Sequence, residues 1–193
     1  MRTANILMTV LFLSVPGSPR AQADHATTGA PEVFNATAEV KNANGAISGK
    51  FEVRLNRYTP DFDRASVETA LRQGGYPRFL PALRKAPEVG QLVLGGSPPY
   101  AIRYAREKVE AGVRTIVLVT DKPVFFVGAW RADAKPQAGY EVALVQIQID
   151  AKGQAHGTLA AAARVRPDGD GGVLLDSYTE EPAELTNLTR KPL

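Results

Sequence analysis

Apolar and polar positions alternate most strictly between residues 47 and 56, where every second side chain is apolar or glycine and the others are polar. A period of two predicts a β-strand with one buried face. Asn44 and Gly45 precede the strand, and this pair is a strong hairpin signal because both residues tolerate positive φ. We therefore expect residues 34–41 to pair antiparallel with residues 47–57.

The period then changes to that of a helix. Thr59 suits an N-cap and Pro60 a first helical position, and Gly74 and Gly75 are expected to end the helix. Its apolar stripe consists of Phe62, Val67, Ala70 and Leu71. A second short helix is expected to start or kink at Pro81, because proline disrupts a helix interior. It contains Phe79, Leu80 and Leu83.

We expect this helical pair to cover one face or one open end of the sheet. The matching surface on the sheet is predicted to consist of Ile47, Phe51, Val53 and Leu55. Further strands are predicted at residues 91–94, 100–109, 114–120, 140–149, 157–166, 173–178 and 185–190.

Residues 115–119 are apolar at every position but the first, which indicates a central strand covered on both faces. The alanines at 160–163 fit a strand or a helix, and their small side chains predict close packing by something bulky. Residues 125–127 and Trp130 fit either a strand or a short helix. The fold class is therefore α+β, a mainly antiparallel β-sheet or partly closed β-barrel with one inserted helical pair.

The N-terminus has the layout of a secretory signal peptide. Arg2 supplies a positive charge, residues 6–15 are apolar, and Ala21, Gln22 and Ala23 form a small-x-small cleavage site. The apolar run is too short for a stable transmembrane helix. We therefore expect an exported protein, periplasmic or secreted.

The domain division follows from this interpretation. Residues 1–23 are the predicted signal peptide, residues 24–32 a flexible N-terminal arm, and residues 33–193 a single globular domain. No second apolar stretch reaches membrane-spanning length, so no membrane span is expected after cleavage.

Composition excludes several classes of chemistry. The chain has no cysteine, which excludes disulfides, thiolate metal sites and cysteine nucleophiles. Its formal charge is +3, and cleavage would remove Arg2 and Arg20. A nearly neutral mature chain with scattered basic residues gives no reason to expect nucleic-acid binding.

No motif points to a catalytic or metal site. His25 and His156 lack partners at metal-ligand spacing, and residues 168–172 resemble a calcium loop only at their first positions. We therefore predict no catalytic residue, no metal site and no cofactor. Acids that could form a general acid–base pair are Glu107, Asp121, Asp176, Glu180 and Glu181, but no spacing singles out two of them.

Aromatic and arginine side chains give the best ligand-binding candidates, because aromatics beside arginine suit carbohydrate or aromatic ligands. The candidates are Tyr100, Arg103, Tyr104, Arg106, Asp121 and Trp130. The alternative is that these aromatics form the core and its rim.

Four stretches together resemble a group of uncharacterised exported bacterial proteins. They are residues 57–59 (RYT), 100–106 (YAIRYAR), 114–123 (RTIVLVTDKP) and 182–187 (PAELTN). The resemblance covers about residues 47–190, with tyrosine at Tyr58 and Tyr100 where the group usually has tryptophan. It implies a bacterial source and a single exported domain, and no activity.

Three hypotheses for function remain open. The favoured one is a non-enzymatic exported domain that binds a small molecule, a glycan or an envelope protein. The second is a hydrolase of a cell-envelope or extracellular polymer, with Asp121 as the first acid to test. The third is a small barrel that carries an apolar ligand, with interior space left by the alanines at 160–163.

Overall fold

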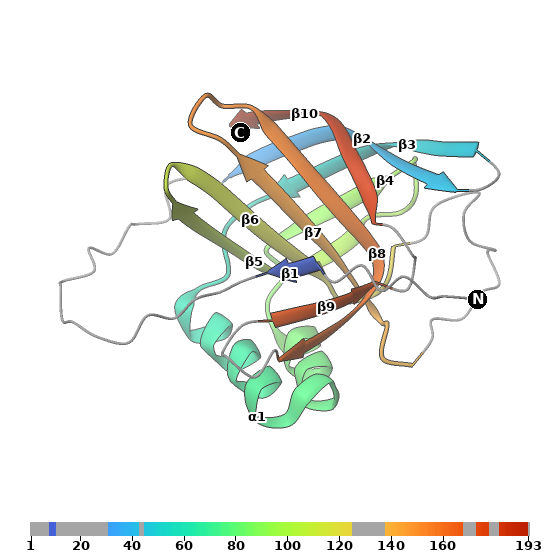
Figure 1. The fold of residues 1–193 in the computed structure, drawn as a ribbon. Helices are drawn as coiled ribbons and strands as arrows, with labels where there is room; N and C mark the ends of the chain where they lie inside the picture. The colour runs from blue at the N-terminus through green and yellow to red at the C-terminus, as the bar shows by residue number, and fades with distance from the viewer. Residues whose placement is uncertain are drawn as a thin grey trace.

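The computed structural model describes residues 8–10, 31–42, 45–124, 138–167, 173–177 and 182–192 (Figure 1). Its strands are β1 (Met8–Val10), β2 (Glu32–Asn42), β3 (Gly45–Leu55), β4 (Gly90–Leu94), β5 (Tyr100–Glu110), β6 (Val113–Thr120), β7 (Val142–Ile149), β8 (Ala155–Pro167), β9 (Val173–Ser177) and β10 (Ala183–Pro192). One helix, α1 (Asp61–Lys85), is inserted between β3 and β4.

Eight of the strands form a closed antiparallel barrel. Strands β2 to β8 pair in chain order, β10 pairs with β8, and β10 also pairs with β2. The expectation of a mainly antiparallel, β-rich fold is confirmed, but the barrel is fully closed where the sequence suggested partial closure. Closure pairs both edges of the eight-stranded sheet, so neither is left with unpaired backbone groups.

Strand β8 is 13 residues long, and its two halves pair with different strands. Its first half closes the barrel, and its second half pairs with β9 outside the barrel. On the other side of β9 lies β1, which belongs to the predicted signal peptide. Both short strands are visible beside the barrel in Figure 1.

The predicted hairpin is confirmed. Strands β2 and β3 pair antiparallel along their whole length, and Val40 lies opposite Ile47. The predicted inward face of β3 is also confirmed, since Phe51, Val53 and Leu55 are buried whereas the intervening Arg54 is exposed.

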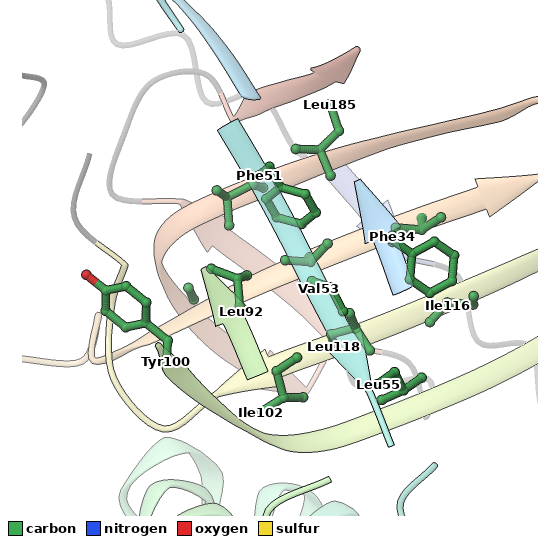
Figure 2. Close-up of a cluster of buried hydrophobic side chains, with 14 of the residues drawn as sticks. Phe34, Phe51, Val53, Leu55, Leu92, Tyr100, Ile102, Ile116, Leu118 and Leu185 are labelled. Atoms are coloured by element: carbon green, nitrogen blue, oxygen red, sulfur yellow. The ribbon is translucent and has the colours of Figure 1, made fainter. Parts of the chain in front are cut away.

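The barrel interior is an apolar core. Figure 2 shows side chains from several strands meeting there, including those of Phe34, Phe51, Leu92 and Leu118. The largest fully buried apolar side chains of this cluster are Phe34, Phe51, Leu55, Leu92, Leu94, Ile102, Ile116, Leu118, Ile147 and Leu159. Such filling is typical of eight-stranded barrels, whose interiors are about one layer of side chains wide.

The helical insert differs from the predicted pair. It is one helical element, interrupted by the non-helical backbone of Gly75 (φ 60°, ψ −161°). Pro77 follows this break closely, but Pro81 lies inside the helix rather than at its start. Thr59 is not the N-cap: its buried hydroxyl accepts a hydrogen bond from the backbone N–H of Ala105 at 2.8 Å.

The face that α1 covers also differs from the expectation. The inward face of β3 lies inside the barrel, whereas α1 packs on the outside, where its Phe79 and Leu83 share a cluster with Val117 and Leu144. Figure 1 shows the helix below the barrel wall. Phe62, predicted to belong to the apolar stripe, is 86% exposed.

Two predictions about covered strands are confirmed. In β6, Ile116 faces the interior core and Val117 the helix, so the strand is buried on both faces. The alanine run lies in β8, and its Ala160 and Ala163 are buried in the same cluster as the bulky side chains of α1. Small side chains let the helix approach the sheet closely.

The predicted flexible arm, residues 24–32, wrongly includes Glu32. Glu32 begins β2 and is fully buried, so order starts before residue 33. Residues 24–30 of the arm, residues 125–127 and the candidate Trp130 lie outside the described residues, as do residues 168–172. Within the described ranges, no helix is both long and apolar enough to cross a bilayer.

Candidate functional site

The two ends of the barrel carry different side chains. Glu32 opens β2 and Arg190 lies near the end of β10, so both are at one end, which we call the ion-cluster end. Towards the opposite end, β2 carries Ala38 and Val40 and β10 begins with Ala183; both alanines are buried in the interior core, and Val40 packs against it. We call this second end the strap end, after the segment described next.

A segment that we call the strap, residues 120–124, leaves β6 and attaches to the strands beside it. The hydroxyl of Thr120 donates to the carbonyl of Lys122 (2.6 Å) and accepts from the N–H of Ala143 (2.9 Å). The N–H of Val124 donates to the carbonyl of Ala161 (2.8 Å), and Val124 is buried in the interior core. The strap therefore connects β6 to β7 and β8 at this end.

Small apolar side chains line the interior next to the strap. Ala38, Ala143 and Ala183 are at most 3% exposed and belong to the interior core. Ala38 also lies opposite Gly49 in the hairpin. Three alanines therefore contribute to the interior at the strap end, beside the larger side chains of Val124 and Tyr100.

Tyr100 and Lys122 lie together at the same end. Tyr100 is largely buried at the start of β5, and Figure 2 shows it at the margin of the apolar cluster with its hydroxyl directed away from Leu92. The ammonium nitrogen of Lys122 lies 5.2 Å from the centre of the Tyr100 ring, within cation–π range.

Arg103 and Asp121 form an ion pair beside the strap. Arg103 Nε donates to Asp121 Oδ2 at 3.0 Å, and an Nη of Arg103 donates to the carbonyl of Ala86 (3.3 Å). Arg84 Nε donates to the backbone carbonyl of Asp121 at 3.2 Å. These contacts hold the C-terminal end of α1 against the strap.

The structure separates the predicted ligand-binding residues into two groups. Tyr100, Arg103 and Asp121 lie at the strap end. Tyr104 instead faces α1, where its hydroxyl donates to Glu68 (2.8 Å) and Arg106 forms an ion pair with the same carboxylate (3.3 Å). This second group joins the helix to the barrel wall.

Sequence reasoning missed the network at the ion-cluster end. We call it the ion cluster, and its members are Glu32, Tyr58, Glu107, Arg114 and Arg190. The Glu32 carboxylate accepts hydrogen bonds from the hydroxyl of Tyr58 (2.8 Å), from Arg114 (2.5 and 3.2 Å) and from Arg190 Nε (2.5 Å). Arg114 also donates to Glu107 at 3.0 Å.

The electrostatics of the ion cluster keep Glu107 charged. Burial alone would raise the pKa of Glu107, but hydrogen bonding and the charge of Arg114 outweigh it and hold this pKa below its usual value. Burial and the neighbouring Glu32 raise the pKa of the Tyr58 phenol, which therefore stays protonated. Two carboxylates and two guanidiniums balance in charge.

This network is suited to binding the strands together rather than to proton transfer. A general acid needs a raised pKa, and that of Glu107 is lowered. Among the described residues, no three His, Asp or Glu side chains could hold a metal ion together. The alternation of positions along the strands could have revealed the cluster. Glu32 lies two residues from the inward-facing Phe34, and Arg114 lies two residues from the inward-facing Ile116.

Comparison with known proteins found no matching family model, no matching curated protein and no matching solved structure. The resemblance to uncharacterised exported bacterial proteins therefore stays a prediction from the sequence.

Proposed function

We propose that this protein is an exported, non-enzymatic binding barrel that takes a small apolar ligand at the strap end. The single observation that carries the proposal is the difference between the two ends. Five polar side chains in mutual contact fill the ion-cluster end, whereas the strap end is apolar and holds Ala38, Ala143 and Ala183 beside Val124 and Tyr100. An apolar guest would enter where it displaces no charged group.

The middle of the barrel limits the size of the ligand. Phe51, Leu92, Ile102 and Leu118 are at most 1% exposed and fill the centre of the interior (Figure 2). Because buried side chains of this kind pack closely, a ligand would fit only at the strap end. The expected ligand is therefore a short alkyl chain or a single aromatic ring.

The geometry favours this function over the hydrolase hypothesis. In the ion cluster, arginines hold Glu32 and Glu107 by direct hydrogen bonds. At the strap end, the carboxylate of Asp121 is engaged by Arg103. None of these arrangements pairs a protonated acid with a second free carboxylate, as glycoside hydrolysis requires.

Titration calorimetry of the purified protein with n-octanol tests the proposal. We expect saturable binding at one site and a loss of affinity in Ala183→Leu, where the larger side chain takes the ligand's place. Overpacking costs about 1–3 kcal/mol, which corresponds to a loss of affinity of about five- to 150-fold. Ala155→Leu is the matched control, because Ala155 contacts the interior core near the other end of the barrel.

Circular dichroism establishes that both variants fold. If folded wild-type protein binds neither octanol nor a naphthalene dye, the apolar-ligand proposal is wrong. Co-purification of a glycan or an envelope protein without any small molecule would instead support partner binding through the sheet.

A further inference from the structure

We infer that the ligand of the strap end carries an anionic group, which Lys122 binds at the rim of the barrel. This inference deepens the proposed function and rests on it. The ligand class is a short-chain carboxylate, with its apolar part among the small side chains of the interior and its carboxylate outside beside Lys122.

The balance of charge at the strap favours an anion. Among the described residues, three cationic side chains, Arg84, Arg103 and Lys122, and one carboxylate, that of Asp121, contact the strap or belong to it. Arg103 pairs with that carboxylate, and Arg84 bonds the backbone of the same residue. Of the described side chains, no carboxylate forms an ion pair with Lys122. The strap therefore carries a surplus of positive charge, which attracts anions.

The position of Lys122 fits this role. Its side chain is exposed, and its ammonium lies over the ring of Tyr100, which borders the apolar interior. The backbone carbonyl of Lys122 is fixed by the hydroxyl of Thr120, which is itself bonded to Ala143. One cation is thus held within a few residues of the alanine-lined interior.

An amphipathic anion satisfies both parts of the strap end. Its alkyl chain gains from leaving water, and the gain grows with each CH₂ group that is buried. Its carboxylate stays at the surface, where it keeps its hydration and gains an ion pair with Lys122. A neutral ligand gains only the first contribution, and a cationic ligand is repelled.

Calorimetry with octanoate and n-octanol, which share one chain length, tests the inference. We expect octanoate to bind up to about fivefold more tightly than octanol, the upper limit for an exposed ion pair. Lys122→Met should abolish this preference while octanol binding stays within about twofold. Raising the salt concentration should weaken octanoate binding only.

Lys152→Met is the matched control, because Lys152 is exposed in the turn between β7 and β8 at the ion-cluster end. It should keep the preference for octanoate. Equal affinities of wild-type protein for the two ligands, or an unchanged preference in Lys122→Met, would overturn the inference but leave the proposed function intact. Failure of both ligands to bind would overturn the proposed function itself.

Discussion

Glu32 and Arg190 join the first and last strands of the barrel. The guanidinium Nε of Arg190 donates to Glu32 Oε2 at 2.5 Å, and the two residues lie on the paired strands β2 and β10. Arg114 contacts the same carboxylate from β6, across the interior. One buried acid therefore links the closing seam of the barrel to the opposite wall.

Removing the charge of Glu32 should destabilise the protein strongly. Glu32→Gln removes a fully buried charge that pairs with the partly buried Arg114 and with Arg190, and breaking a buried ion pair costs about 3–5 kcal/mol. Glu52→Gln is the control, since Glu52 pairs only with the exposed Arg54 and should change stability by less than about 1 kcal/mol. Urea denaturation measures both changes. Similar midpoints would show that the ion cluster contributes little.

The register of β3 can be tested by neighbouring substitutions. Phe51→Ala removes a side chain that is 1% exposed in the barrel interior and should cost about 3–5 kcal/mol. Lys50→Ala changes an exposed position and should stay within about 0.5 kcal/mol. Urea melts of the two variants give the contrast. A shift of the strand by one residue would exchange the two results.

Close packing between α1 and β8 should make Ala160 intolerant of larger side chains. Ala160 is 3% exposed beneath the helix, so Ala160→Leu should cost about 1–3 kcal/mol through overpacking. Ala151→Leu, in an exposed turn, should have little effect. Thermal unfolding compares the two, and equal stability would mean that the helix does not rest on this part of β8.

Stability should decrease above about pH 10, where tyrosines of the unfolded chain ionise. Burial raises the pKa of Tyr58 and of Tyr104. It also raises the pKa of Tyr76, to about 12. The stability that each tyrosine contributes is complete below its pKa in the unfolded chain. It is lost as the pH rises towards the pKa of the same tyrosine in the folded protein. The slope should reach about 1.4 kcal/mol per pH unit for each tyrosine.

Urea melts between about pH 8 and 11 measure this slope. Tyr58→Phe should be less stable than wild type at neutral pH, because Glu32 and Arg114 lose a hydrogen-bond partner. Its stability should also fall less steeply above about pH 10. Parallel curves for the variant and wild type would show that Tyr58 ionises normally.

Local structure was determined largely by the sequence. The alternation in β3, with the Asn44 and Gly45 turn signal before it, predicted the hairpin and its inward face. Strands were predicted at residues 100–109 and 114–120, and the positive φ values of Ala111 and Gly112 form the turn between them. These features depend on neighbours in the chain, whose periodicity and backbone preferences are visible in one sequence.

Part of the candidate site was also visible in the sequence. Tyr100, Arg103 and Asp121 were named from their residue types, and the structure places them at one end of the barrel. Lys122 was missed, because its position over Tyr100 depends on how the strap returns from β6 to β7.

Only the tertiary structure decided what each face meets. Periodicity shows that Phe51 and Leu55 share a face, but it does not show whether a helix or the opposite wall of a barrel covers that face. Closure depends on pairing between β10 and β2, which are far apart in the chain. The register shift between Thr186 and Thr189, where Asn187 has φ 52°, brings Arg190 into contact with Glu32, because one extra residue reverses the alternation.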